Sequence, residues 1–118
     1  MKLFDAELKV MEVLWSRGPL AAGQLAKLLK DDIGWNRNTT YTVIKKLVVK
    51  GAIQRIDPQF ICEALITREQ AQEQETIGLI KKMFNGSTEL FFSSFINEKN
   101  LTDSDINKLK KIVDNLKR

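Results

Sequence analysis

The feature that most constrains the fold is a change of hydrophobic period within residues 5–66. Three segments repeat their apolar residues every three to four positions, as amphipathic helices do, and two short alternating or apolar runs follow, as strands do. Gly18 and Pro19 separate the first two helical segments, and the turn-forming residues 57–59 separate the two strand-like runs. Helix, helix, helix and hairpin, in that order, predict a winged helix-turn-helix.

The boundaries of these elements follow from capping and turn residues. Asp5 is expected to cap the first helix, and Asn36 is expected to cap the third, which ends before Gly51. In chain order, the first helix follows Asp5, and a very short strand is expected at 20–21. A second helix at 22–30 and a polar turn at 31–35 lead to a third helix at 37–50, and the two strands of the hairpin are expected at 52–56 and 60–66.

Beyond the hairpin the pattern predicts helices only. Thr67 with Gln70 forms a capping-box pattern, Ser87 can cap a second helix, and Thr102 with Asp105 resembles a third capping pattern. The expected helices span 68–84, 88–97 and roughly 103–116. The fold class is therefore mainly α with a small β-hairpin wing: a winged helix-turn-helix DNA-binding domain at 1–66 and a three-helix dimerisation segment at 67–118.

The third helix carries the clearest single-sign charge in the chain. It holds four basic residues, and no acid occurs within 36–50. Because Thr40, Val43, Ile44, Leu47 and Val48 form one apolar stripe, the other face presents polar groups that can bond base edges or phosphates. The candidate DNA-binding residues are Arg37, Asn38, Thr39, Tyr41, Thr42, Lys45, Lys46 and Lys50. The alternatives are an ordinary solvated face, or a winged-helix module that only assembles with other proteins.

The segment after Ser87 is too apolar for a simple surface helix. Large apolar side chains surround most of it, and an exposed patch of this kind usually marks an interface, although a local core between neighbouring helices is the alternative. The predicted homodimer interface comprises Leu90, Phe91, Phe92, Phe95, Ile96, Ile106, Leu109 and Val113.

Composition argues against several other classes of protein. The chain has no histidine and one cysteine, Cys62, so it lacks the commonest general base and cannot form a multi-cysteine metal site. No enzyme activity, cofactor or metal is expected, and Cys62, Trp15 and Trp35 are interpreted as packing residues. Neither a signal peptide nor an apolar membrane span is apparent, which predicts a cytoplasmic protein. The net charge of +4 is compatible with a nucleic-acid partner.

Three segments resemble the penicillinase and methicillin-resistance repressors and their copper-responsive relatives. They are the first helix, DAELKVMEVLW at 5–15; the third-helix segment, WNRNTTYTVIKKLVVKG at 35–51; and the C-terminal part, where an apolar segment precedes LTDSDI at 101–106 and a final amphipathic helix. The similarity covers essentially the whole chain in order.

The resemblance implies a cytoplasmic dimeric repressor that binds dyad operators, often with TACA and TGTA halves. In the antibiotic-responsive members a membrane-bound sensor-protease leads to cleavage in the C-terminal segment, at a bond that aligns with Ser94–Phe95 here. Those members typically have asparagine where this chain has Ser94. The copper-responsive members carry a CxC…CxC tail, whereas this chain ends in Lys117 and Arg118, so metal sensing through that motif is not expected. The wing at 57–59 is also shorter than in the antibiotic-resistance repressors.

Overall fold

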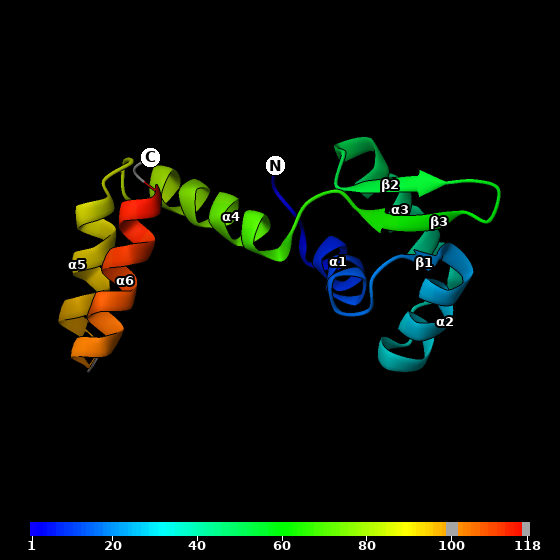
Figure 1. Cartoon of the computed structure of the whole chain (residues 1–118), viewed down its shortest axis with the longest axis horizontal. Helices are drawn as coiled ribbons and strands as arrows, with labels where there is room; N and C mark the ends of the chain where they lie inside the picture. Colours follow the sequence, from blue (N-terminus) through cyan, green and yellow to red (C-terminus); the bar gives the residue numbers. More distant parts are fainter. Residues whose placement is uncertain (99–101, 117–118) are drawn as a thin grey trace. The chain divides into compact units, whose positions relative to one another are not determined.

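The computed structural model describes residues 1–98 and 102–116, which form two compact units, Met1–Ala71 and Gln72–Arg118. In chain order the elements are α1 (Asp5–Arg17), β1 (Leu20–Ala21), α2 (Ala22–Ile33), α3 (Arg37–Lys50), β2 (Ile53–Ile56), β3 (Ile61–Ala64), α4 (Arg68–Met83), α5 (Thr88–Glu98) and α6 (Asp103–Leu116) (Figure 1). The predicted class, mainly helical with a winged helix-turn-helix and C-terminal helices, is confirmed.

A three-stranded antiparallel sheet closes the first unit. Its order is β1-β3-β2, so the short strand β1 pairs with β3 and not with the next strand along the chain. Leu20 lies opposite Cys62, and Ile53 lies opposite Ala64. One core lies beneath α1, α2, α3 and the sheet; its fully buried large side chains include Val10, Met11, Leu25, Leu29, Ile44, Leu47 and Ile53.

Several boundaries differ from the sequence prediction by one to three residues, and the start of α1 and the end of α2 show the physical reason most clearly. Asp5 is the first residue of α1 and not its cap; Phe4 occupies the cap position, and its backbone N–H donates to Oε1 of Glu7 at 2.8 Å. The second helix continues past Lys30 to Ile33, because Asp31 and Asp32 are exposed and Gly34 supplies the left-handed residue that ends the helix.

The second unit contains most of α4 together with α5 and α6. The predicted capping bonds are present: the N–H of Leu90 donates to Oγ of Ser87, and the N–H of Asp105 donates to Oγ1 of Thr102. Helices α5 and α6 pack on each other (Figure 1). Phe84 and Phe91 meet edge to face with ring centroids 5.4 Å apart, which fixes the turn between α4 and α5.

Candidate nucleic-acid interface

Helix α3 is held by one buried face. Thr40, Val43, Ile44 and Leu47 are buried against α1, α2 and β2. Val48, predicted to extend this stripe, is 36% exposed instead, because it lies on the edge of the buried arc. Asn36 accepts the N–H of Thr39 at 2.8 Å, and Gly51 ends the helix in the left-handed conformation, so both ends are defined.

The opposite face of α3 presents polar and basic side chains to solvent. Asn38, Thr42, Lys45 and Lys46 are exposed. Thr39 is exposed as well, but its hydroxyl donates to Oδ1 of Asn36 at 3.1 Å. No Asp or Glu occurs between Asp32 and Asp57, so no acid of the same segment offsets these lysines. Such a face combines hydrogen-bonding groups with an unbroken positive charge.

Four side chains stack from α3 to the wing. The guanidinium of Arg37 lies 5.1 Å from the ring centroid of Tyr41 and donates to its hydroxyl at 3.0 Å. Tyr41 meets Phe60 edge to face at 5.7 Å, and the guanidinium of Arg55 lies 3.7 Å from the Phe60 ring. This Arg37–Tyr41–Phe60–Arg55 stack leaves Tyr41 only half exposed. Sequence reasoning missed Arg55 and Phe60, although their position at the hairpin turn was a signal.

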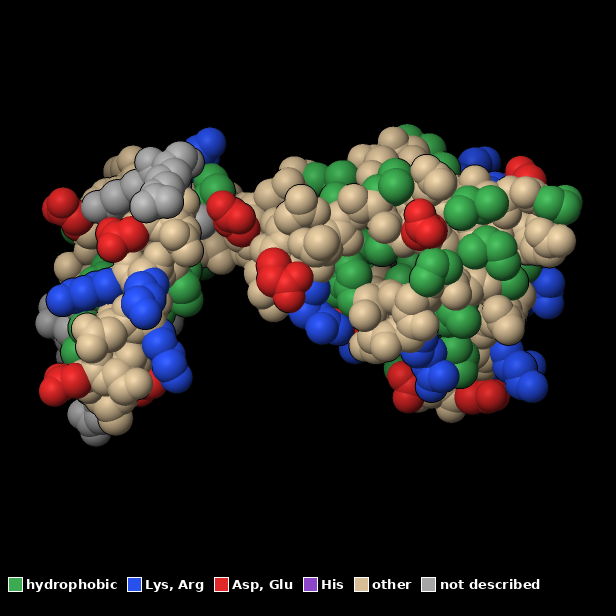
Figure 2. Space-filling view, in the orientation of Figure 1, with side chains coloured by type: hydrophobic (Ala, Val, Ile, Leu, Met, Phe, Trp, Pro, Cys, Tyr) green, Lys and Arg blue, Asp and Glu red, His purple; other side chains and the backbone are tan. Residues whose placement is uncertain are grey.

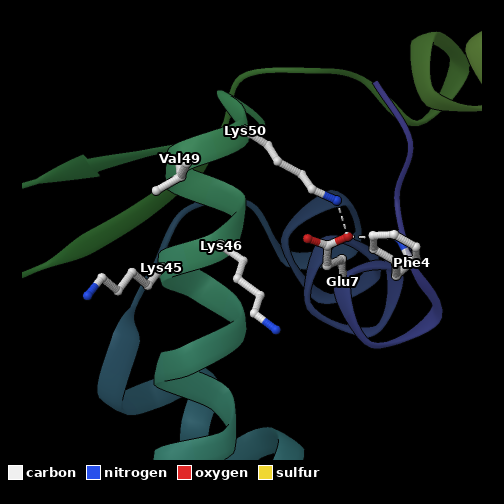
Figure 3. Close-up of a pocket in the computed structure, with 6 residues that line it drawn as sticks. All are labelled: Phe4, Glu7, Lys45, Lys46, Val49 and Lys50. Carbon is white, nitrogen blue, oxygen red and sulfur yellow. Dashed lines mark hydrogen bonds and ion pairs between the residues drawn. The ribbon is translucent and has the colours of Figure 1, made fainter.

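Lys50, grouped with the other lysines from the sequence, is engaged within the protein. Its ammonium donates to Oε1 of Glu7 at 2.5 Å (Figure 3) and also to the carbonyl of Lys2 at 2.8 Å. Glu7 is only 3% exposed. Burial raises its pKa, but the hydrogen bonds from Lys50 and the Phe4 N–H outweigh burial and hold the pKa below its usual value of 4.5. The carboxylate is therefore charged at neutral pH.

Among residues 1–98 and 102–116 no group of His, Cys, Asp or Glu side chains could hold a metal ion, and no helix there is long and apolar enough to cross a membrane. Cys62 is fully buried, and burial raises the pKa of its thiol to about 11. Trp35 packs against the core, and Trp15 donates to the carbonyl of Ile66 at 2.9 Å, as their interpretation as packing residues requires.

Comparison with known proteins covers nearly the whole chain. The penicillinase repressor family model matches residues 3–115. The chain belongs to this family. It is 25% identical over 115 residues to the penicillinase repressor of Bacillus licheniformis. The aligned region covers 96% of this chain and 90% of that protein. It is 22% identical over 114 residues to the methicillin resistance regulatory protein MecI of Staphylococcus aureus (strain N315), with 95% and 93% covered.

Penicillinase repressors regulate transcription and are not enzymes, which confirms the class predicted from the sequence. A protein of Latilactobacillus sakei, called an uncharacterized 16.5 kDa protein, is also similar, with 26% identity over 114 residues that cover 95% of this chain and 78% of that protein. The polar face of α3 is therefore interpreted within a family of repressors.

The predicted interface residues of this penicillinase-family repressor lie on α5 and α6. Leu90 is exposed, whereas Phe91, Phe92, Ile106 and Leu109 are half-buried. The side chains of Phe95, Ile96 and Val113 lie outside the described residues. The bond that aligns with the family's cleavage site falls inside α5, where the hydroxyl of Ser94 donates to the carbonyl of Phe91 at 2.8 Å.

Proposed function

We propose that the protein is a sequence-specific repressor that binds a dyad operator in double-stranded DNA as a homodimer. The observation that carries the proposal is the exposed face of α3, which is polar, basic and without an acid from 33 to 56. In a helix-turn-helix the second helix of the pair enters the major groove, and α3 holds that place after α2. An assembly module would present a more apolar or mixed surface there.

The exposed side chains of α3 form two groups, one suited to the edges of the bases and one suited to the phosphates. Asn38 and Thr42 are exposed and suited to base edges, with Thr39 beside them. Lys45 and Lys46 are exposed and suited to phosphates, and Arg37 lies at the N-terminus of the helix, where the backbone N–H groups also favour an anion. Tyr41 serves mainly to support Arg37 through their hydrogen bond.

Dimerisation is proposed to use the second unit. Four large apolar side chains of this unit, Leu79, Met83, Leu90 and Ile112, are exposed in the single chain, and hydrophobic groups reach its surface in Figure 2. A second copy could cover these groups, and a two-fold dimer would place two copies of α3 on two half-sites. The repressed genes would belong to an antibiotic-response or resistance operon, as the relatives' names suggest.

Proteolysis near Ser94–Phe95 is proposed as a route to derepression. A protease requires an extended substrate, and this bond lies in a helix, so α5 would have to unfold locally before cleavage. Cleavage would divide α5, detach its last turn together with α6 from the rest of the chain, and so weaken the dimer. The two half-sites would then be bound by independent chains, and the gain in affinity from linking them would be lost.

The proposal is tested by selecting the operator from random duplex DNA with the full chain. Thr42→Ala should weaken binding to the selected operator by about 1–3 kcal/mol and binding to a scrambled duplex by less. Lys46→Ala should lower the slope of log K against log salt by about 0.9. Lys9→Ala, an exposed lysine on α1, is the matched control. Failure of the parent chain to bind any duplex would favour the assembly module.

A further inference from the structure

A groove separates the N-terminal segment from the C-terminal half of α3. It has a volume of about 430 Å³ and is lined by Phe4, Glu7, Lys45, Lys46, Val49 and Lys50 (Figure 3). Its apolar residues are poorly covered: Phe4 is 58% exposed and Val49 is 81% exposed. The folding of the first unit therefore leaves an aromatic ring and a branched side chain in contact with solvent.

The groove is electropositive. Three of its lining residues are lysines of α3, and the ammonium of Lys2 lies 5.3 Å from the centroid of the Phe4 ring. Lys50 lies over the same ring at 4.5 Å. Glu7 is the one acid among the six lining residues, and its negative charge is offset by its ion pair with Lys50. Lys2, Lys45 and Lys46 form no ion pair within the described part of the chain.

The N-terminal side of the groove is fixed in place. Leu3 is buried in the core, the N–H of Phe4 donates to Glu7, and Lys50 donates to the carbonyl of Lys2. These contacts hold the backbone of residues 2–4 against α1 and the end of α3. Lys50 and Glu7 therefore act as positioning residues for Lys2 and Phe4, and the groove is preorganised.

The groove also continues the proposed DNA-binding face. Asn38, Thr42, Lys45 and Val49 follow one another at intervals of four, three and four residues, which places them along a single side of α3. A duplex bound to the first two of these residues would have its backbone near the last two. We propose that this groove binds the DNA backbone beside the recognised bases, with Lys2 and Lys46 holding a phosphate and Phe4 packing on the adjoining deoxyribose.

The chemistry of the groove favours this occupant. A DNA backbone alternates anionic phosphates with the largely apolar faces of the sugars, and the groove pairs lysines with the Phe4 and Val49 side chains. A small anion with an apolar body would satisfy the same groups, so the experiment has to separate the two. The inference rests on the proposed function, because it adds contacts to the same protein–DNA complex.

The experiment measures binding of the full chain to the selected operator over a range of salt concentrations. Lys2→Ala should lower the salt slope by about 0.9 and lower affinity about eightfold at about 0.1 M salt. Phe4→Ala should lower affinity on the order of tenfold with the slope unchanged, since it removes apolar contact and no charge. Lys9→Ala should change neither quantity. Melting temperatures verify that each variant is folded.

Neutral methylphosphonates, introduced one at a time into the operator, then identify the phosphate. One such substitution should weaken binding by the parent chain clearly more than binding by Lys2→Ala, which keeps only the Lys46 contact to that phosphate. If the Lys2→Ala and Phe4→Ala chains bind the operator as tightly as the Lys9→Ala chain does, the groove does not bind the DNA backbone. If Lys46→Ala still lowers operator affinity in that case, the proposed function stands. If the parent chain binds no duplex, both proposals fail. If Lys2→Ala lowers affinity by the same factor for every methylphosphonate operator, the assignment to a single phosphate is overturned. A small-anion site becomes the better account if Lys2→Ala and Phe4→Ala both leave DNA binding unchanged.

Discussion

Glu7 is a buried acid that joins the N-terminal segment to the end of α3. Its Oε1 accepts two hydrogen bonds, from the N–H of Phe4 and from the ammonium of Lys50, while its buried Oε2 has no partner among the described residues. A buried carboxylate without these donors would be strongly destabilising. The pair therefore fixes the distance between α1 and α3, which the proposed DNA contacts require.

The lowered pKa of Glu7 predicts a pH dependence of stability. Because the pKa is lower in the folded than in the unfolded chain, the pair stabilises the fold above the usual pKa of 4.5, and this contribution is lost as pH falls through the folded value. Glu7→Gln should lower the free energy of unfolding by about 1–2 kcal/mol near neutral pH and by less in acid. Urea denaturation of both chains at about pH 7 and about pH 3 measures the difference. Equal losses at both pH values would contradict an ionised Glu7.

Cys62 should be unreactive in the folded protein. It is fully buried, and its pKa of about 11 leaves little thiolate at neutral pH. A chromogenic disulfide reagent should label the native chain only as fast as it unfolds, and label it at once in denaturant. Because this is the one cysteine in the sequence, the signal is unambiguous. Rapid labelling of one equivalent without loss of structure would show that the thiol is accessible.

At the scale of elements, local signals predicted most boundaries and failed where a partner lies far away in sequence. Asn36 and Gly51 delimit α3 as expected, because caps act within a few residues. The end of α2 was misplaced because Asp31 and Asp32 suggest a turn, although exposed acids are equally compatible with a helix. The contact between Lys50 and Glu7 joins residues 43 positions apart, and nothing in the local pattern indicates it.

The apolar surface of α5 gives a prediction about self-association. Leu90 is 59% exposed in the single chain, so Leu90→Asp should leave its stability nearly unchanged. In a two-fold dimer both copies would carry the change, and the dimer dissociation constant should rise at least about 100-fold. Leu65→Asp, at a comparably exposed leucine of the first unit, is the control. Sedimentation that shows the parent chain to be monomeric at micromolar concentration would remove the second unit from its proposed role.

At the scale of the whole molecule, two kinds of surface are left uncovered. The first unit presents a basic face on α3, and the second presents apolar side chains on α4, α5 and α6. DNA suits the first surface and another copy of the chain suits the second, and a dyad operator requires both together. The order of elements made the first unit predictable from sequence. The sequence also predicts that the second unit has an apolar surface. Which side chains stay exposed on that surface depends on how α5 and α6 pack, and the sequence pattern does not indicate this.

The most direct test of this account is a titration of the selected operator with the full chain, set beside the same titration of a duplex with its half-sites scrambled. The two measurements use identical salt, because phosphate contacts alone bind any sequence. Sequence-specific repression by a dimer predicts two chains bound per operator and a preference for the operator of at least about a thousandfold. Equal affinity for the two duplexes would contradict sequence-specific repression through α3.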